Sequence, residues 1–589
     1  METFRLWAPI PKTVELAIPS GRISMSRQPD DWWVAQVPSL DAEGAYGFIV
    51  DGEGPFPDPR SPWQPSGVDR LSRTVSHQAF VWSDAGWQAP PLSSAVLYEV
   101  HIGTFTPRGT FDAAIEKLDH LVELGVTHVE LMPVNEFSGD RGWGYDGVDL
   151  YAPHHAYGGP EGLKRLVNAC HLKHLAVILD VVYNHFGPVG NYWAKFGPYF
   201  HHHFSTPWGP AVNFDGAHSD EVRRFFCDNA LMWLRDYHFD GLRLDALHAI
   251  ADHSAVPFIE QLAAEVKELE AQLGRHLALI AENDTNDPRL LWSRGRGGYE
   301  LHAHWNDDFH HALHSVLTGE TTGYFADFGS LADVCKALQQ AYVYDGRYSQ
   351  FRKCRHGRAP SGLTGHRFLA YLQNHDQIGN RVLGERSSHL MSAGRLKVAA
   401  ALVLTSPFLP MFFQGEEWGA STPFLYFCDH QDATLAQAVR EGRRREFAAF
   451  VQKPGDIPDP QAPETFARSK LAWEELLQPR HADVLDWHKR LIRLRRSEQS
   501  LSDGRMDGVC ARCDEQDRWL TVERGPWSIV CNLGPAPVTV RLREGAHQLL
   551  AASEVGIIPT PPTVTLPPDS VALFKVADEK PIPPAGKPL

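Results

Sequence analysis

The sequence predicts an α/β protein in which a (β/α)8 TIM barrel, residues 91–500, is flanked by two β-sandwich domains, residues 1–90 and 501–589. Three observations support this prediction. Through the middle of the chain, short apolar runs alternate with segments of helical periodicity, which is typical of a parallel barrel. Both ends contain short apolar runs separated by turn residues instead. A chain of 589 residues also exceeds one ordinary core, so about two to four domains are expected.

The first 90 residues are expected to form a separate all-β domain. Its apolar runs, at residues 4–7, 14–18 and 32–37, are broken by proline and glycine at turn spacing, and a sandwich of about seven strands fits this pattern. The proline-rich residues 55–65 are interpreted as a covering loop or linker, and residues 87–91 as the domain boundary.

Eight buried strands are then predicted in order. Apolar residues at helical spacing predict helices between several of them, at residues 112–124 (where Gly125 ends the pattern), 162–172 and 222–237. Residues 346–365, rich in glycine and arginine, are predicted to be a loop. The eight strands are predicted at residues 95–102, 126–134, 176–182, 239–248, 277–282, 301–304, 368–373 and 408–413.

Helical sequence continues to about residue 496, and short alternating runs return after Gly504, for example at residues 519–523 and 527–531. These runs predict a small β-sandwich that ends near residue 576. The tail at residues 581–589 contains four prolines and is expected to be flexible. No internal repeat is found.

Composition excludes several classes of protein. The formal net charge of −16 argues against a nucleic-acid partner, which requires a concentrated basic face. No run of about 18 apolar residues predicts a membrane span, and the first five residues lack the basic start of a signal peptide. A cytoplasmic protein with no membrane partner is expected. The aromatic content of 11% permits a carbohydrate site without demonstrating one.

Cysteine and histidine patterns give no metal site. Eight scattered cysteines do not form a disulfide framework, and most are expected to be reduced and buried. Cys510 and Cys513 form one C-x-x-C pair, but a structural zinc site needs four ligands in paired spacing. The triple histidine at residues 201–203 stays unassigned.

Polar residues cluster where the predicted strands end. The third strand ends in Asp180 and is followed by Asn184 and His185, the fifth ends in Glu282, and residues 374–376 follow the seventh. The carboxyl ends of barrel strands carry the active sites of such folds, and four polar strand ends together are costly unless they serve a function. Catalysis is therefore favoured over a structural role.

The fourth strand carries Arg243 and Asp245 on one face, because they are two positions apart. Alone, this pair is equally compatible with a structural ion pair. An adjacent cation favours the ionised carboxylate that a nucleophile needs. Several carboxylates flanked by histidines suit glycoside hydrolysis, in which a retaining mechanism needs a nucleophile and a protonated acid roughly 5–5.5 Å apart.

Residues 180–185, 241–245, 281–284 and 373–376 resemble, in order, the four signature regions of the α-amylase superfamily of glycoside hydrolases. The resemblance covers residues 95–500, and the N-terminal domain resembles the carbohydrate-binding-like sandwich of its branching and debranching members. It implies Asp245 as nucleophile, Glu282 as general acid/base and Asp376 as the group that distorts the sugar. It also implies sugar contacts by Arg243, His185 and His375, and stacking by Tyr145 on the same sugar.

Longer stretches at residues 136–146, 282–287, 304–311 and 413–418 resemble the malto-oligosyltrehalose trehalohydrolase family. Its members cut the α-1,4 bond next to a terminal trehalose unit and release trehalose. The resemblance implies no cofactor, a functional link to a malto-oligosyltrehalose synthase, and further substrate contacts by His248, Asp307, Asp308, Phe309, His310, His311, His375, Gln377 and Asn380. Paired acceptors such as Asp307 and Asp308 suit trehalose hydroxyls, although acids also favour a helix start, and His310 and His311 also fit a helix surface.

Two alternative functions stay open. A 1,4-α-glucan branching enzyme shares the expected fold and acids but transfers the glycosyl group to a sugar hydroxyl. A glucan-binding protein without turnover is the alternative from another class, which the presence of all three carboxylates disfavours. The substrate chain length, the oligomeric state and a structural cation are not indicated by the sequence.

Overall fold

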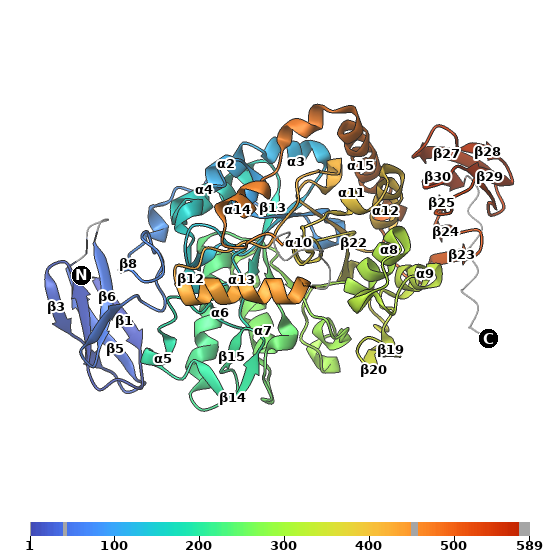
Figure 1. Ribbon diagram of the computed structural model, residues 1–589. Helices are drawn as coiled ribbons and strands as arrows, with labels where there is room; N and C mark the ends of the chain where they lie inside the picture. Colours follow the sequence, from blue (N-terminus) through green and yellow to red (C-terminus); the bar gives the residue numbers. More distant parts are fainter. Residues whose placement is uncertain (1, 39, 41–43, 449–456, 577–589) are drawn as a thin grey trace.

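A computed structural model describes residues 2–38, 40, 44–448 and 457–576. A closed eight-stranded barrel lies in the middle, with β-sheets from the two ends of the chain on opposite sides of it (Figure 1). This confirms the predicted fold class. The predicted flexible tail, residues 581–589, lies outside the described residues. The element bounds below are compatible with domain boundaries near residues 90 and 500, which remain a prediction.

Two antiparallel sheets form the N-terminal part. One has the order β1–β5–β4 and the other β3–β2–β6–β7, with β8 paired to β6. The predicted runs at residues 4–7, 14–18 and 32–37 fall on β1, β2 and β5. The strands are β1 (Glu2–Trp7), β2 (Val14–Ile18), β3 (Gly21–Ser24), β4 (Ser26–Arg27), β5 (Trp32–Val37), β6 (Ala45–Val50), β7 (Glu53–Phe56) and β8 (Ser72–Arg73).

All eight predicted barrel strands are present and parallel, and β22 pairs with β9 to close the barrel. The first, second, fourth and sixth strands each begin two residues later than predicted, and in the sixth, ladder pairing with β17 starts only at Ala303. The strands are β9 (Leu97–Val100), β10 (His128–Leu131), β13 (Ala176–Val181), β16 (Gly241–Leu244), β17 (Ala278–Ala281), β18 (Ala303–Trp305), β21 (Phe368–Ala370) and β22 (Leu409–Phe413).

Helices surround these strands (Figure 1). The helix predicted at residues 112–124 is two helices, α2 (Phe111–Ile115) and α3 (Leu118–Leu124), and Gly125 ends the second one in the left-handed region at φ 99°. The longer helices are α4 (Gly159–Leu172), α6 (Ser219–Asp236), α7 (Phe258–Leu273), α8 (Asp307–Thr318), α9 (Leu331–Gln340), α12 (Ala393–Thr405), α13 (Ala433–Phe447) and α15 (Pro479–Ser497). The shorter ones are α1 (Ile102–Phe105), α5 (Trp193–Phe196), α10 (His375–Gly379), α11 (Ser387–Leu390), α14 (Pro463–Arg468) and α16 (Gln499–Ser502).

Three hairpins are inserted after barrel strands. They are β11 (Asn135–Phe137) with β12 (Gly147–Pro153), β14 (Phe200–Thr206) with β15 (Gly209–Val212), and β19 (Asp345–Ser349) with β20 (Cys354–Gly357). The third corrects the prediction of a loop at residues 346–365. A distant carboxylate, Asp327, accepts hydrogen bonds from the backbone N–H groups of residues 350 and 351 at 2.8 and 3.2 Å, so the hairpin turn depends on a contact that local sequence does not reveal.

The C-terminal sheets pack against the barrel helices α9 and α12. Arg524 donates from Nη1 to the carbonyl oxygens of Thr405 and Ser406, at 2.8 Å each, and so caps the end of α12. The sheets have the orders β23–β24–β25–β30–β27 and β26–β29–β28. Their strands are β23 (Val509–Asp514), β24 (Trp519–Arg524), β25 (Trp527–Asn532), β26 (Val538–Arg541), β27 (His547–Ala552), β28 (Ile558–Thr560), β29 (Thr563–Leu566) and β30 (Ser570–Val576).

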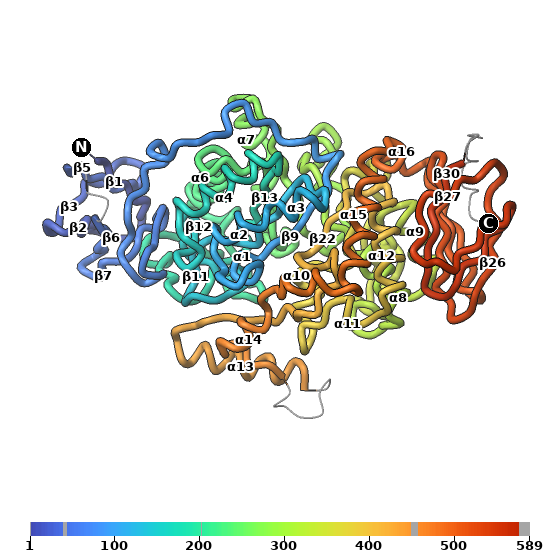
Figure 2. The backbone as a smooth tube through the Cα atoms, turned by 90° about the horizontal axis from the view of Figure 1, so that it is seen from above, coloured from blue at the N-terminus to red at the C-terminus, as the bar shows by residue number. Residues whose placement is uncertain are grey.

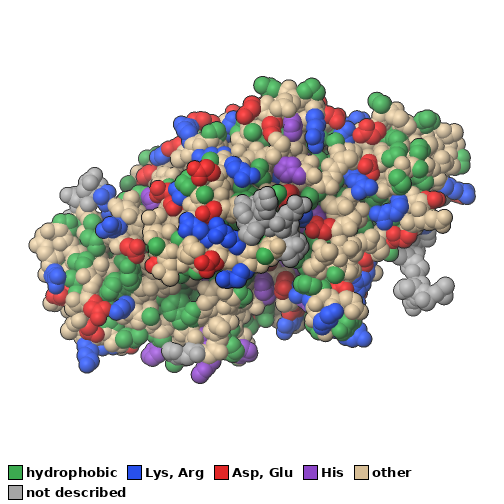
Figure 3. Space-filling view, in the orientation of Figure 1, with side chains coloured by type: hydrophobic (Ala, Val, Ile, Leu, Met, Phe, Trp, Pro, Cys, Tyr) green, Lys and Arg blue, Asp and Glu red, His purple; other side chains and the backbone are tan. Residues whose placement is uncertain are grey.

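The distribution of charged side chains and the composition of the helices agree with the expectations from the sequence. Basic and acidic side chains are interspersed on the face that Figure 3 shows. No helix in the described part of the chain combines the length and apolar composition that a membrane crossing requires. Seen from above, α13 and the segment that precedes it stand out from the barrel (Figure 2).

Candidate active site

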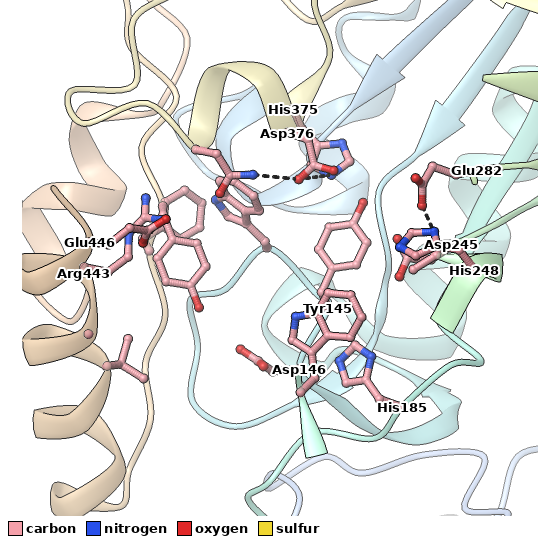
Figure 4. A pocket seen from close by; sticks show the side chains of 18 residues that line it. Tyr145, Asp146, His185, Asp245, His248, Glu282, His375, Asp376, Arg443 and Glu446 are labelled. Carbon is pink, nitrogen blue, oxygen red and sulfur yellow. Dashed lines mark hydrogen bonds and ion pairs between the residues drawn. The ribbon is translucent and has the colours of Figure 1, made fainter. Parts of the chain in front are cut away.

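A pocket of about 620 Å³ brings together predicted site residues from the ends of several barrel strands (Figure 4). This volume is within the range of small-molecule sites. The predicted residues that line it are Tyr145, His185, Asp245, His248, Glu282, His375, Asp376 and Asn380.

Arg243 is the electrostatic centre of the site. Its side chain is fully buried on β16. Nη1 donates to both oxygens of Asp180, at 2.8 and 3.0 Å, and to Oδ1 of Asp245 at 2.6 Å. Nη2 lies 3.6 Å from Oε2 of Glu282, and the guanidinium lies 4.2 Å from the centre of the Trp305 ring. One cation therefore binds Asp180 and Asp245 directly and lies close to the carboxyl of Glu282, so that three acidic side chains from three adjacent strands meet at Arg243.

Asp245 is fixed on both sides. While Oδ1 faces Arg243, Oδ2 accepts a hydrogen bond of 2.8 Å from Nδ2 of Asn184. The next residue, Ala246, has a φ of 42°, an uncommon backbone conformation for alanine. This bend lets the Ala246 N–H donate to Oε2 of Glu282 at 2.6 Å. The strained turn thus links the two carboxylates.

The carboxyl of Glu282 is expected to carry a proton, as a general acid must. Burial raises the pKa of its carboxyl; Arg243 opposes this effect, and the charges of Asp245, Asp307 and Asp376 add to it, so that the pKa is about 8. At neutral pH the carboxyl is therefore mostly protonated and can donate a proton. A protonated carboxyl in this position suits the acid of a glycoside hydrolase.

Asp376 and His375 begin the short helix α10. Asn374 caps this helix, accepting a hydrogen bond of 2.9 Å from the Asp376 N–H. The His375 ring bonds to the buried carboxylate of Glu99 on the first strand. Burial alone lowers the pKa of His375, but the charges of Glu99 and Asp376 raise it to about 9. His375 is therefore a cation beside Asp376 at neutral pH.

Tyr145 lies in the turn between β11 and β12. Its ring stacks on His375, with centroids 5.1 Å apart, and its hydroxyl donates to Oδ2 of Asp180 at 2.6 Å. The preceding Gly144 has a φ of 101°, and a Cβ there would lie 2.2 Å from the carbonyl oxygen of Pro133. Only glycine fits this turn.

Three predicted contact residues on α8 do not reach the pocket. Asp308 accepts hydrogen bonds from the backbone N–H groups of residues 343 and 344 at 2.7 and 2.6 Å. Phe309 and His310 have no exposed surface, and Nδ1 of His310 donates to the carbonyl oxygen of Leu372 at 2.6 Å. The structure thus places these three residues away from the pocket lining, because a helix start at residue 307 turns them towards the core.

The neighbouring predicted residues are near the pocket but do not line it. Asp307 accepts a hydrogen bond of 2.7 Å from Tyr371, and its charge acts on Glu282. The side-chain Oε1 of Gln377 accepts a hydrogen bond of 2.8 Å from the Asn374 backbone N–H, which completes the capping box of α10. The His311 ring packs among the aromatic rings of residues 324, 325 and 328.

Several lining residues were not predicted from the sequence. Trp208, at the tip of the β14–β15 hairpin, is half exposed and stacks on His185 with centroids 5.0 Å apart. A tryptophan followed by glycine, in the segment between the third predicted strand and the helix predicted at residues 222–237, could have signalled it. The remaining additions come from the turn between β11 and β12, from the residue after Asp245, and from α13 with its preceding loop: Trp143, Asp146, Ala246, Tyr426, Phe427, Val439, Gly442, Arg443 and Glu446.

One group of side chains in the described part of the chain has the composition of a metal site. Glu136, His154 and His155 bring one carboxylate and two imidazoles within 4.8 Å of one another. The Glu136 carboxylate already accepts hydrogen bonds from the backbone N–H and Nδ1 of His155, at 2.8 and 2.6 Å. The unassigned His201 pairs with Asp215 at 3.2 Å.

Comparison with known proteins defines the class first. Residues 78–202 match the family described as "Alpha amylase, catalytic domain", and residues 505–573 match "Domain of unknown function (DUF3459)". Together with the barrel and its carboxylate site, this match defines a glycoside hydrolase of the α-amylase superfamily.

Relatives then define the family. A malto-oligosyltrehalose trehalohydrolase of Mycobacterium tuberculosis is 48% identical over 95% of this chain and 96% of its own length, and one of Saccharolobus solfataricus is 45% identical over 88% and 89%. The chain belongs to the malto-oligosyltrehalose trehalohydrolase family. The crystal structure of a putative α-amylase of Salmonella typhimurium is similar to this chain (TM-score 0.90, 37% identity, 97% of both chains). A glucan branching enzyme of Corynebacterium jeikeium is only 28% identical over 66% of this chain.

Proposed function

We propose that this protein hydrolyses the α-1,4-glucosidic bond that adjoins the terminal trehalose of malto-oligosyltrehalose, releasing trehalose and a maltodextrin. The observation that carries the chemistry is the pair of carboxyls beside Arg243, of which Glu282 has a pKa of about 8. The names of relatives with 42–48% identity support the substrate.

In the proposed mechanism, Glu282 gives its proton to the bridging oxygen while Asp245 attacks the anomeric carbon. Trehalose leaves, and the glucan stays bound to Asp245 through a covalent ester. Glu282, now a carboxylate, takes a proton from water, and the water oxygen displaces Asp245. Two inversions at one carbon retain the α-configuration. Asp376 steadies the charge of the sugar in both transition states.

The substrate contacts follow the lining residues. Tyr145, His185 and His375 line the pocket beside Asp245, where the reacting sugar has to lie (Figure 4). Arg243, which the sequence also suggested as a sugar contact, is buried beneath the pocket and holds Asp245. We assign His248, Asn380 and, one layer further out, Asp307, Gln377 and His311 to the more distant parts of the substrate. No step requires a cofactor. We also propose a cytoplasmic location, a supply of substrate from a malto-oligosyltrehalose synthase, and no nucleic-acid partner.

The first experiment incubates the protein separately with maltotriosyltrehalose, maltopentaose and amylose and resolves the products by chromatography. Free trehalose is expected as the main early product from the first substrate only. The variant Asp245→Ala is expected to lose turnover by about 10⁴-fold or more while keeping the circular dichroism of the folded protein.

Other outcomes support the alternatives. New branch points in amylose without trehalose release indicate a branching enzyme, and binding without turnover on any substrate indicates a glucan-binding protein. An early NMR time course on the maltodextrin product tests the stereochemistry. The α-anomer is expected first, and a β-anomer contradicts the covalent mechanism.

A further inference from the structure

Glu136, His154 and His155 form a cluster at the base of the hairpin β11–β12. Glu136 lies in β11, and the two histidines directly follow β12. One carboxylate oxygen and one nitrogen from each ring lie within 4.8 Å of one another. None of these three residues lines the catalytic pocket, so the chemistry proposed for the pocket does not explain the cluster.

His154 is the member whose presence most needs an explanation. Its side chain has no exposed surface, and neither ring nitrogen has a hydrogen-bond partner within the described ranges. Its Nδ1 nevertheless lies 3.3 Å from Oε2 of Glu136. The ring stacks on Phe137, with centroids 3.8 Å apart, a contact that an apolar ring could make without leaving buried polar atoms unsatisfied. Packing alone therefore does not account for a histidine at this position.

His155 connects the cluster to a second carboxylate. Its Nδ1 lies 2.6 Å from Oε1 of Glu136, and its Nε2 lies 3.0 Å from Oδ1 of Asp140. A protonated ring would make both contacts in a simple ion-pair cluster, but this alternative leaves His154 without a role. A ring that binds a cation through Nδ1 still donates its Nε2 proton to Asp140, and histidine ligands of metal ions commonly have such a carboxylate partner.

The distances and charges fit a tetrahedral centre of the zinc type. Bonds of about 2.0–2.1 Å at tetrahedral angles place two ligand atoms roughly 3.3 Å apart, which is the separation of His154 Nδ1 and Glu136 Oε2. The shorter contact of His155 has to lengthen, and a rotation of this partly exposed ring supplies the difference. The carboxylates of Glu136 and Asp140 together neutralise one divalent cation, as a largely buried ion requires.

We propose that Glu136, His154 and His155 bind one divalent transition-metal ion of the zinc type, with Asp140 orienting His155 and water as the fourth ligand. Imidazole ligands favour Zn²⁺ over Mg²⁺ and Ca²⁺, which prefer oxygen ligands. The ion joins β11 to the residues that follow β12, and so closes the base of the hairpin whose turn carries Tyr145. It stabilises this hairpin and takes no part in the catalytic steps.

The test uses the full chain without a histidine tag, freed of metal with EDTA and then dialysed. Zn²⁺ is titrated by isothermal calorimetry, and the bound metal is counted by mass spectrometry of the elements. One Zn²⁺ per chain and a higher Tm with Zn²⁺ are expected, whereas Mg²⁺ and Ca²⁺ at the same concentration should leave Tm unchanged. A chain that binds no stoichiometric Zn²⁺, or that Mg²⁺ or Ca²⁺ stabilises equally, overturns the inference.

Three variants and a control assign the ligands. Glu136→Gln keeps the size of the side chain and an acceptor oxygen, and His154→Phe keeps an aromatic ring in the stack. Each is expected to weaken Zn²⁺ binding about 100-fold or more. Asp140→Asn, at an exposed position, is expected to weaken it about tenfold. The control His253→Gln removes an exposed histidine that pairs with Asp215 and should leave the affinity unchanged.

Unaltered affinity in the three variants, or a loss of binding in His253→Gln, overturns the inference, because the ion then binds elsewhere on the chain. These measurements do not involve trehalose release, so the proposed function is tested separately from the metal site.

Discussion

The raised pKa of Glu282 makes a quantitative prediction about the pH dependence of activity. A carboxyl with the ordinary value of 4.5 is only about 0.3% protonated at pH 7, whereas one with a pKa of about 8 is about 90% protonated. The buried site therefore increases the fraction of competent acid about 300-fold at neutral pH. Because the acid must carry its proton, kcat/KM is expected to be flat near pH 7 and to fall tenfold per pH unit above about pH 8.

The assay follows trehalose release from maltotriosyltrehalose between pH 5 and 10, with stability checked at each pH. A glycosyl fluoride is the control substrate, since fluoride leaves without protonation. With the fluoride, the rate of the first step, attack by Asp245, is expected not to fall above pH 8. Glu282→Gln is expected to lose activity on the natural substrate but to keep this first step with the fluoride. A fall in kcat/KM that begins below pH 6, or a fall that is identical for both substrates, refutes the assignment of Glu282 as the acid.

Three further predictions concern the residues around the site. In Glu99→Gln, His375 loses the partner that helps raise its pKa from 6.5 to about 9, and thermal unfolding should show a destabilisation of about 3 kcal/mol at pH 6.5. This destabilisation should diminish as the pH rises through 9, because the wild-type protein loses the stabilisation there. A stability difference that stays constant from pH 6 to 10 contradicts this. Asp308→Ala is expected to lower the free energy of unfolding by about 2–4 kcal/mol with little change in kcat. Asp307→Ala should instead lower kcat/KM and move the loss of activity near pH 8 to lower pH, because the charge of Asp307 raises the pKa of Glu282. A loss of activity in Asp308→Ala and a loss of stability in Asp307→Ala would make Asp308 the substrate contact. Gly144→Ala should cost about 2 kcal/mol or more and lower activity by displacing the turn, which urea unfolding and kcat measure together.

The barrel was predictable because each strand is a local apolar run with its own boundary signals. The four polar strand ends were visible for the same reason, since register in a parallel barrel brings them to one edge. Asp180 and Arg243 indeed pair directly across β13 and β16. The second half of the site was not predictable in this way, because it depends on contacts between segments far apart in sequence.

Asp308 and Arg443 illustrate this limit from opposite sides. Asp308 looked like a sugar ligand next to Asp307, but the start of α8 turns it inward to residues 343–344, a contact 35 residues away. Arg443 lies in a helix rich in charged residues, whose sequence is typical of a solvent-exposed helix. Its hydrogen bond to the Gly379 carbonyl oxygen, 64 residues away, holds it at the pocket. A local sequence pattern predicts a helix or a strand, but contacts with distant segments decide which of its side chains reach the pocket.

The cap that Arg524 places on α12 makes the C-terminal sheets hard to separate from the rest of the molecule. Deleting them at residue 500 would take the Arg524 guanidinium away from the carbonyl oxygens of Thr405 and Ser406 and leave Arg495 to bind those of Leu404 and Ser406. It would also uncover the buried Lys397, which bonds to the Ser553 carbonyl oxygen at 3.1 Å. A shortened chain of this kind should therefore be less stable than the full one, and an exchange of this end between relatives has to replace the contacts of both Arg524 and Ser553.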